Sequence, residues 1–265
     1  MPEGHTIARV AREHTAMLVG RPLRLTSPQG RFAEGAALLD GAVLERISPY
    51  GKHLFYGFAG SRWLHVHLGL YGTLRSGPLP APAVRGALRL RMTGETGYVD
   101  LRGPTACELL TPAEKRAIEA RLGPDPLHRG ADPAPAWRRI VRSPTAIGAL
   151  LMDQSVIAGI GNVYRAEVLF QHRMDPHRPG RSLTEAQWHA IWTDLRTLLR
   201  AGVRAGRIVT TLPRHRDRRS GPASRADCYY VYRRTGLPCR ICGTPVATDV
   251  MVGRNLYWCP GCQPA

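Results

Sequence analysis

Hydrophobic and polar residues alternate with two different periods, which divide the chain into a strand-rich first half and a helical second half. Apolar residues recur at helical spacing in residues 3–19, and Gly20 ends that pattern. From residue 21 to about residue 110, short β-rich runs such as HLFYGFA and WLHVHLGL are separated by Gly, Pro and Ser. This pattern predicts the strands of a sandwich or a barrel.

A capped helix follows the strands. In TPAEKRAIEARLG, Thr111 is the expected N-cap, Glu114 completes a capping box and Gly123 marks the stop. The next residues, GPDPLHRGADPAP, have the proline and glycine content of a linker. We therefore expect an N-terminal domain at residues 1–123.

Helical periodicity continues from about residue 136 to residue 206. The stretches TAIGALLMDQSVIAG and NVYRAEVLFQHR predict two helices joined by a short glycine-bearing turn, and a longer helix starts at Thr184. Residues 213–227 are polar and basic without periodicity, which predicts a mobile loop. We expect a helical domain at 124–226 and a small cysteine-bearing domain at 227–265.

Composition and charge indicate the class of partner. The 265-residue chain carries a net charge of +17. Nucleic acid is the favoured partner, because neutralising phosphates releases counterions. An anionic membrane surface is the alternative, but the chain shows neither a basic amphipathic helix nor a polybasic tail. No apolar run reaches the roughly 18 residues of a membrane span. We expect a cytoplasmic, nucleoid-associated monomer that makes no membrane contact.

Lysine is rare in this chain, and its two positions are therefore informative. Only Lys52 and Lys115 are lysines among the 37 basic residues. A lysine kept against such an arginine bias can mark a place where the compact ammonium is needed. Lys115 is expected on the exposed side of its helix, where its presence needs no functional reason.

Four cysteines have the spacing of a metal site. They follow the pattern C-x2-C-x16-C-x2-C at Cys239, Cys242, Cys259 and Cys262. Two such turns can complete a tetrahedral Zn²⁺ site of structural type, because all four positions are taken by sulfur. A disulfide framework is the alternative, and a cytosolic chain disfavours it. We take Cys107 and Cys228 as ordinary thiols.

Two backbone turns in the second half are candidates for phosphate binding. The sequence between the cysteine pairs, TDVMVGRNLYW, predicts a hairpin whose turn contains Arg254, a residue suited to gripping phosphate or simply solvated. In AGIGNVY, backbone N–H groups after Gly161 and the side chain of Asn162 could bind an anion. A plain helix–turn–helix corner is the alternative for this second turn.

The first residues raise a chemical question. If Met1 is removed, Pro2 carries a free secondary amine whose pKa lies well below that of a lysine. Such an amine is a nucleophile that can form an iminium with a sugar aldehyde carbon, and Glu3 could move the proton that this step needs. Taken alone, a proline and a glutamate after Met1 are most simply explained by chance and do not indicate catalysis.

Several motifs occurring together favour a catalytic role for these first residues over chance. The sequences MPEG, GKHLF, LMDQSVIAGIGNVYRAEVLF and GRNLYWCPGCQ, in this order, resemble the formamidopyrimidine-DNA glycosylase/endonuclease VIII family. The Gly after MPE, with GKHLF and GLYG, is more similar to the endonuclease VIII branch. The resemblance implies an α+β fold: an N-terminal helix plus β-sandwich domain, a helical C-terminal domain with a helix–two-turn–helix motif, and a C-terminal zinc-ribbon hairpin.

The resemblance also implies roles for single residues. Pro2 would be the Schiff-base nucleophile, Glu3 the general acid/base, and Lys52 an essential lysine near the damaged nucleotide. Asn162, in the turn with Gly161, would bind backbone phosphate. Arg254 would grip the phosphates that flank the lesion in damaged DNA.

One stretch departs from the family pattern. The family inserts side chains into the gap left by a flipped base. Here LGLYG offers Leu70 and Tyr71 as wedges, but Gly69 stands where the endonuclease VIII pattern has a long polar residue. The alternative for Leu70 and Tyr71 is a place in the core at a strand end.

These features predict a bifunctional DNA glycosylase/AP lyase that excises oxidised pyrimidines in base-excision repair. The same chemistry on oxidised purines is the alternative within the class. A catalytically silent zinc-ribbon DNA-binding protein is the alternative from another class.

Overall fold

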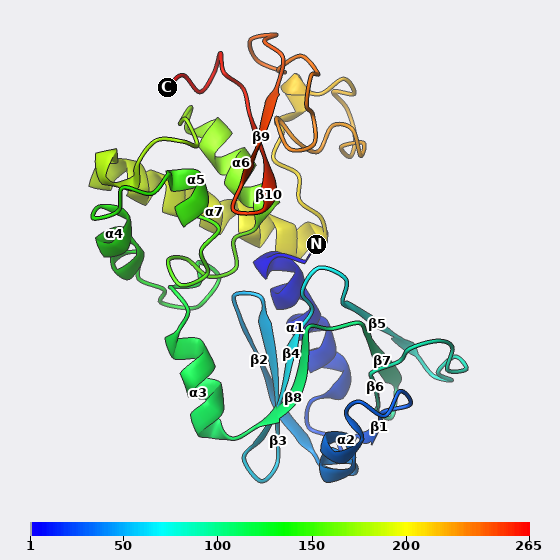
Figure 1. Ribbon diagram of the computed structural model, residues 1–265. Coiled ribbons are helices and arrows are strands. Elements are labelled where there is room, and N and C mark those ends of the chain that lie inside the picture. Colours follow the sequence, from blue (N-terminus) through cyan, green and yellow to red (C-terminus); the bar gives the residue numbers. More distant parts are fainter. Residues whose placement is uncertain (1) are drawn as a thin grey trace. The chain divides into compact units, whose positions relative to one another are not determined.

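The computed structural model describes residues 2–265 and divides the chain into two compact units, residues 1–121 and residues 122–265 (Figure 1). The first unit contains two antiparallel sheets, and the second is mainly helical and ends in a hairpin that lies between two cysteine pairs. The predicted α+β fold class is confirmed. Within residues 2–265, no helix combines the length and the apolar character that crossing a membrane would require.

The first unit is a sandwich of two four-stranded sheets, with strand orders β1-β6-β7-β5 and β2-β3-β4-β8. Helix α1 contacts strands of both sheets (Figure 1). The strands are β1 (Arg24–Thr26), β2 (Leu44–Tyr50), β3 (His53–Phe58), β4 (Arg62–His67), β5 (Thr73–Pro78), β6 (Leu90–Thr93), β7 (Gly97–Arg102) and β8 (Ala106–Leu110). The helices are α1 (Gly4–Leu18), α2 (Ala33–Leu39) and α3 (Pro112–Ala120).

The sheet β2-β3-β4-β8 buries different side chains on its two faces. Leu54 and Tyr56 of β3 belong to the main core of the unit together with Ile7 of α1. Successive side chains of a strand point to opposite faces, so Phe55 lies on the outer face. There it packs with Trp63 of β4 and Ile118 of α3. This outer face therefore has a small apolar cluster of its own.

Helix α3 covers part of that outer face and corrects the expectation for Lys115. The predicted capping box at Thr111 and Glu114 is present. The Lys115 ammonium lies 4.8 Å from the centroid of the Trp63 ring and is paired with Glu119 at 2.5 Å. Lys115 is half-buried rather than exposed, because its long stem packs over the aromatic cluster. Its presence therefore has a packing reason.

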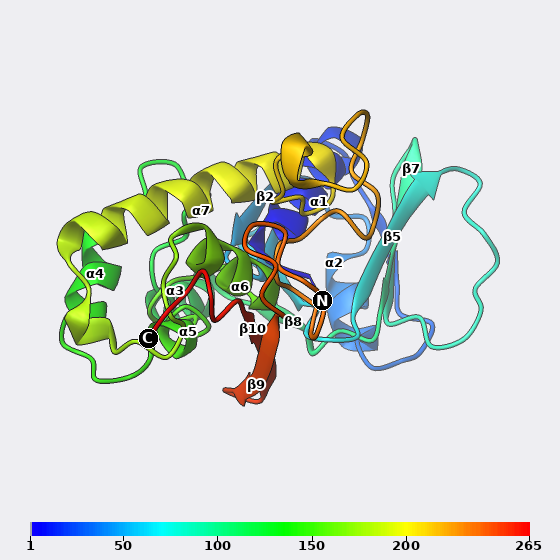
Figure 2. The same ribbon diagram turned by 90° about the horizontal axis from the view of Figure 1, so that it is seen from above.

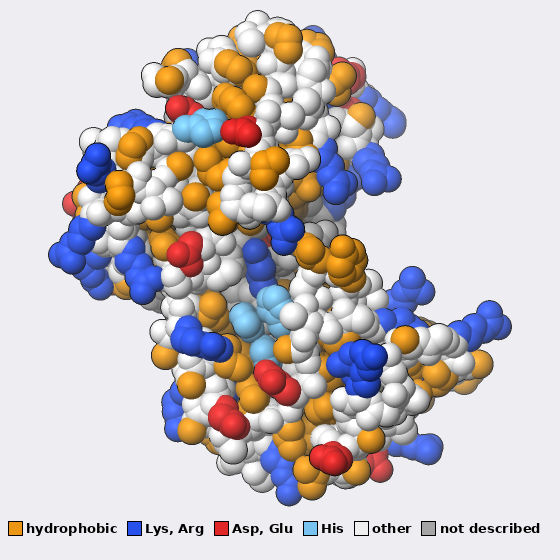
Figure 3. Space-filling view, in the orientation of Figure 1, with side chains coloured by type: hydrophobic (Ala, Val, Ile, Leu, Met, Phe, Trp, Pro, Cys, Tyr) orange, Lys and Arg blue, Asp and Glu red, His pale blue; other side chains and the backbone are white. Residues whose placement is uncertain are grey.

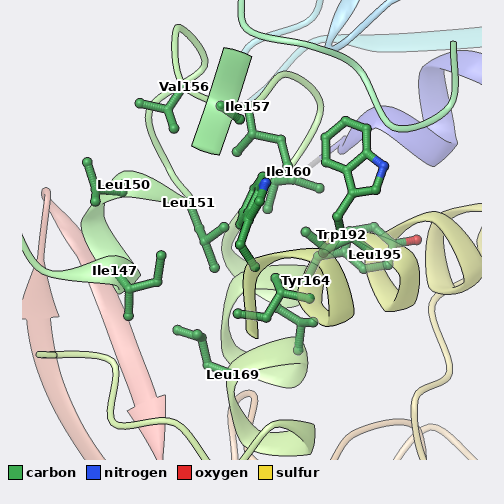
Figure 4. Packing of buried hydrophobic residues seen from close by; sticks show 14 of the residues in the cluster. Ile147, Leu150, Leu151, Val156, Ile157, Ile160, Tyr164, Leu169, Trp192 and Leu195 are labelled. Carbon is green, nitrogen blue, oxygen red and sulfur yellow. The ribbon is translucent and has the colours of Figure 1, made fainter. Parts of the chain in front are cut away.

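In the second unit, helix α7 is the longest element and runs along the unit in Figure 2. The predicted capping box at Thr184 is present, and Gly206 ends the helix in the left-handed conformation. The remaining elements are α4 (Ala134–Ile140), α5 (Ile147–Leu150), α6 (Asn162–Gln171), η1 (Gly180–Ser182), α7 (Glu185–Ala205), η2 (Pro213–His215), β9 (Ala247–Met251) and β10 (Arg254–Trp258). In the core, Leu151, Ile157 and Ile160 point toward Tyr164 of α6 and Trp192 of α7 (Figure 4).

The prediction of one helix over residues 145–159 is wrong, because only the four-residue α5 forms there. The polar side chains after α5 bind the backbone locally and replace helical hydrogen bonds. Asp153 accepts from the backbone N–H of Ser155. The Gln154 amide donates to the carbonyl of Ile160 at 2.9 Å and accepts from the N–H of Gly159 at 3.0 Å. These bonds define two successive turns that lead into α6.

Residues 213–227 differ from the expected mobile loop. Apart from η2 the segment has no regular structure, yet it is tied at several points. The Arg240 guanidinium donates to the carbonyl of Ala226 and forms an ion pair with Asp227 at 3.1 Å. Asp227 also accepts from the backbone N–H of Asp217. Hydropathy cannot detect these ties, because they join positions that are distant in the sequence.

We expect Gln154→Ala to lower the free energy of unfolding by about 1–3 kcal/mol. The change leaves the buried N–H of Gly159 and the carbonyl of Ile160 without their side-chain partner. Denaturant unfolding followed by circular dichroism measures the effect. Gln187→Ala, which removes a half-buried capping-box glutamine whose hydrogen bond to the Thr184 N–H is exposed, is the matched control and should cost less. Equal losses in the two variants would contradict this explanation of the turns.

Candidate functional site

The N-terminal candidates lie at the start of α1. Glu3 is the N-cap residue of this helix, and its carbonyl accepts from the N–H of Thr6 at 2.8 Å. The Glu3 side chain is fully buried, whereas Pro2 is half-buried. Ile7 and Leu18 of the same helix lie in the core and fix its position. Met1, whose removal would free the Pro2 amine, lies outside the described residues.

Lys52 lies in the tight turn between β2 and β3. Tyr50 and His53 are paired across this hairpin, and Gly51 adopts a positive φ of 56° that permits the turn. Lys52 is half-buried and belongs to the same unit as Pro2 and Glu3. A short turn between two paired strands is a rigid support for an ammonium group.

Histidines that the sequence analysis did not single out follow this turn. His53 opens β3, and His65 and His67 lie two residues apart on β4, so all three point to the outer face of the sheet. Figure 3 shows histidine side chains gathered over β2 and β4. The His53 Nδ1 and His65 Nε2 atoms are 2.9 Å apart. The sequence does contain a signal for this cluster. His65 and His67 alternate with Val66 on one predicted strand, and His53 directly follows Lys52 on the strand before it.

Burial keeps this histidine cluster neutral. It lowers the pKa of His53 to about 3, and the neighbouring His67, His65, Arg121 and Lys52 act in the same direction. Burial also lowers the pKa of His65 and of His67. The charge of Lys52 is among the causes that lower the pKa of His53 and of His67.

Leu70 and Tyr71 lie in the loop between β4 and β5 and are exposed. Their exposed fractions are 43% and 86%, so the alternative of a strand-end core position is wrong. Gly69 has a φ of +64°, and a Cβ atom there would lie 1.9 Å from Thr105 Oγ1. A Cβ at Gly72 would lie 2.2 Å from the carbonyl oxygen of Leu68. The loop thus excludes a side chain at residue 69 and presents its two apolar residues to solvent.

In the second unit, Asn162 and the hairpin strand β10 are in direct contact. The Asn162 Nδ2 atom donates to the carbonyl of Asn255 at 2.9 Å. The guanidinium of Arg165, which is fully buried, donates to the same carbonyl at 3.1 Å and to Asn162 Oδ1. Gly161 is the N-cap of α6. Asn162 therefore helps to hold the hairpin as well as lying at the start of a helix, and the sequence pattern did not indicate Arg165.

Arg254 is the first residue of β10 rather than part of the turn. The turn consists of Val252 and Gly253, which both have positive φ values. Arg254 is half-buried and its backbone pairs with Met251 of β9, whereas its guanidinium forms no side-chain hydrogen bond or ion pair within the described residues 2–265. Its neighbour Asn255 is bound by α6, so the backbone beside Arg254 is fixed while its guanidinium is available to an anion.

The four predicted metal-ligating cysteines come together. The Sγ atoms of Cys239, Cys242, Cys259 and Cys262 all lie within 4.8 Å of one another. Four thiols at this separation fit one tetrahedral metal ion, and they leave no position for a substrate. Cys107 and Cys228 lie outside this group.

Two buried polar residues join the cysteine-bearing segment to the rest of the unit. The Glu167 carboxylate, on α6, accepts from the backbone N–H groups of Tyr230, Val231 and Tyr232 at 2.8–2.9 Å and from the Thr210 hydroxyl. Burial raises the pKa of Glu167, although these hydrogen bonds favour its charged form. Arg240, between two cysteines, holds the 213–227 segment.

Comparisons with known proteins match three family descriptions to the chain. Residues 1–107 match the formamidopyrimidine-DNA glycosylase N-terminal domain. Residues 122–213 match the formamidopyrimidine-DNA glycosylase H2TH domain. Residues 236–265 match the zinc finger found in FPG and IleRS. Together these matches cover most of the chain.

Relatives and solved structures agree with these matches. Endonuclease 8 1 of Mycobacterium tuberculosis is 50% identical over 269 residues, covering 99% of this chain and 100% of the relative. The formamidopyrimidine-DNA glycosylase of Thermus thermophilus is 33% identical and covers 99% of this chain and 98% of the relative. The Lactococcus lactis Fpg in complex with DNA containing an abasic site has the same fold, with a TM-score of 0.82, 22% identity and coverage of 99% and 100%. The chain belongs to the formamidopyrimidine-DNA glycosylase/endonuclease VIII family of DNA-repair proteins.

We expect Gly69→Ala to destabilise the first unit more than Gly20→Ala. Both glycines have a positive φ, which costs a residue with a side chain about 1–3 kcal/mol, but a Cβ at Gly20 meets nothing within 4 Å. The difference between the two variants in thermal unfolding therefore measures the collision with Thr105. The double variant Gly69→Ala/Thr105→Gly should recover that difference. If Gly69→Ala alone costs no more than Gly20→Ala, Thr105 does not exclude a side chain from the loop.

Proposed function

We propose that this protein is a bifunctional DNA glycosylase/AP lyase that removes oxidised pyrimidine bases and then cuts the strand by elimination. The observation that carries the proposal is the motif MPEG at the start of a chain that is 50% identical, over its whole length, to a protein named endonuclease 8. Removal of Met1 turns Pro2 into a secondary amine that is partly unprotonated at neutral pH.

The proposed chemistry divides between the amine and its neighbour. The Pro2 nitrogen attacks C1′ of the damaged nucleotide, the glycosidic bond breaks, and the deoxyribose ring opens to give an iminium. The iminium withdraws electrons, so loss of a C2′ proton breaks the C3′–O bond and releases the phosphate. Glu3 protonates the sugar oxygen as the ring opens. The Glu3 side chain is buried at the N-cap of α1, next to Pro2, which places its carboxyl group beside the proposed nucleophile.

Other residues are proposed to bind the DNA. Lys52 contacts a phosphate near the damaged nucleotide as a compact charge, and Arg254 grips phosphates that flank the lesion. Asn162 and the N-terminus of α6 at Gly161 bind a backbone phosphate. Leu70 and Tyr71, exposed on their loop, fill the gap that the flipped base leaves. Gly69 adds no polar group to this loop, so it makes no hydrogen bond through a side chain to the opposite base.

The cysteine cluster is proposed to hold a structural Zn²⁺ ion. Four thiolates with no open position give the ion a role in folding rather than in bond breaking. When bound, the ion cross-links the two ends of the hairpin that carries Arg254. Arg240, next in sequence to Cys239, binds Ala226 and Asp227, so an ordered cysteine cluster also holds the 213–227 segment in place.

One experiment tests the catalytic residues. Borohydride trapping on DNA with an abasic site, followed by peptide mass spectrometry, should give a covalent adduct on Pro2. Pro2→Gly and Lys52→Ala should stay folded and lose base excision, whereas Lys115→Arg, which changes the other lysine, should retain it. Glu3→Gln should lose base release and keep cleavage at a preformed abasic site. Full base release by folded Pro2→Gly protein would contradict the assignment.

The trapping experiment also separates the alternatives. An adduct on a lysine would move the chemistry to Lys52. No adduct, in folded protein shown to lack Met1, would leave a DNA-binding protein without catalysis. A relative of 33% identity is named formamidopyrimidine-DNA glycosylase, so oxidised purines are the alternative substrates. A panel of thymine glycol, 8-oxoguanine and formamidopyrimidine duplexes distinguishes the two substrate classes.

We expect removal of zinc by a chelator to expose residues 213–227 to trypsin before the rest of the chain is cut. The segment contains several arginines and is tied to the cysteine cluster through Arg240. The cleavage sites are identified by mass spectrometry. Arg240→Ala should show the same early cleavage while zinc is still bound, and re-adding zinc should protect only the wild type. Cleavage that starts outside residues 213–227 would show that Arg240 does not couple the cysteine cluster to this segment.

A further inference from the structure

A row of hydrogen-bonded side chains runs across the outer face of the β2-β3-β4-β8 sheet and ends beside Lys52. The His65 Nδ1 atom lies 2.8 Å from Glu108 Oε1, and the His65 Nε2 atom lies 2.9 Å from His53 Nδ1. His65 and Glu108 are directly paired across β4 and β8, and His53 pairs with His67 across β3 and β4. The register of three strands therefore builds this row.

The carboxylate at one end fixes where the protons lie. An ionised carboxylate only accepts hydrogen bonds, so Glu108 requires a proton on His65 Nδ1. The neutral His65 ring then accepts at Nε2, and His53 must donate from Nδ1. The Nε2 atom of His53 is left unprotonated. The row thus presents a neutral imidazole acceptor next in sequence to Lys52.

The same row can carry a proton from His53 toward Glu108. A proton that binds His53 Nε2 allows His53 Nδ1 to release its proton to His65 Nε2. The positive charge then lies on His65, 2.8 Å from the Glu108 carboxylate, and His53 is neutral again. Half of the Glu108 side chain is exposed, so this end is open to water. His65 itself is buried and stacked on Phe55 with ring centroids 4.9 Å apart, which holds its orientation.

We propose that Glu108, His65 and His53 form a proton relay that accepts the proton released beside Lys52 and stores it as a His65–Glu108 ion pair. This role rests on the proposed function, in which the damaged nucleotide lies near Lys52 and elimination releases a C2′ proton. His53 and His65 act as positioning and relay residues in that step. The charged groups that face the row are Lys52 and Arg121, which oppose its protonation, and Glu108, which favours it. The His67 ring lies beside that of His53, with centroids 4.7 Å apart and the ring planes tilted by 42°.

The first test examines the row without any reaction. In ¹⁵N-histidine-labelled protein at neutral pH, two-bond ¹H–¹⁵N spectra should show His53 and His65 protonated at Nδ1. His53→Gln and His65→Gln assign their signals among the ten histidines. A proton on Nε2 of His65 in the wild type would overturn the relay, because Glu108 and His53 could not then be joined through that ring.

The second test follows the relay during the reaction. Single-turnover cleavage of DNA with an abasic site is measured as a function of pH for the wild type and Glu108→Gln. The amide keeps an acceptor for His65 but removes the charge that stabilises the protonated relay. We expect the rate at neutral pH to fall about tenfold and the acidic limb of the profile to move to lower pH. A merely structural role would lower the rate without moving that limb.

Two controls isolate the effect. His14, buried on α1 and 2.8 Å from the Tyr56 hydroxyl, has a pKa that burial lowers to about 4, but it does not belong to the row. His14→Gln should keep the wild-type pH profile. Binding to DNA with a tetrahydrofuran abasic analogue should be unchanged in Glu108→Gln, so the loss lies in the rate constant.

The outcomes separate this inference from the proposed function. An active wild type whose pH profile coincides with that of Glu108→Gln would overturn the relay alone. An inactive wild type, folded and lacking Met1, would overturn the proposed function and with it the role of the relay in elimination. Expected tautomers together with a displaced acidic limb would support both.

Discussion

The second unit depends on one buried carboxylate. Glu167 lies inside the protein on α6 and accepts three consecutive backbone N–H groups from the chain that leads into the cysteine hairpin. A buried polar group costs free energy unless it is hydrogen-bonded, and removing one side of such a contact leaves the other side unsatisfied. This requirement fixes the direction in which the chain leaves the helical core.

A second junction completes this arrangement. Asn162 and Arg165, on the first turn of the same helix, bind the carbonyl of Asn255 on β10. Helix α6 therefore holds both the entry to the cysteine segment and the hairpin within it. Arg254 is adjacent to Asn255, so its backbone position is set by the same helix that begins at the proposed phosphate-binding turn. The two proposed phosphate contacts of this unit are thus parts of one structure.

The first unit uses the two faces of a sheet for different purposes. Side chains on the inner face, with Leu54 and Tyr56, join the core around α1. The outer face carries Phe55 and Trp63, with Lys115 of α3 packed over them, toward one end, and the histidine row toward the Lys52 turn. Because strand side chains alternate, the residues that stabilise the sandwich and those proposed to act on DNA share the same strands without competing for the same space.

The sequence by itself determined the features that depend on local spacing. The capping boxes at Thr111 and Thr184, the strand-rich first half and the cysteine pattern all rest on residues a few positions apart, and the structure contains each of them. Family motifs in the sequence also indicated the fold class. The helix expected over residues 145–159 failed because the side chains of Asp153 and Gln154 form turns that hydrophobic periodicity does not register.

Only the tertiary structure decided which distant residues meet. It brought Glu108 to His65 and His53 through strand pairing, and Arg240 to Asp227 across the cysteine segment. It showed why residue 69 is a glycine, because Thr105, 36 residues away in the sequence, occupies the space that a side chain would need. It also exposed Leu70 and Tyr71. Contacts of this kind follow from register and packing, whereas a one-dimensional pattern records only neighbours along the chain.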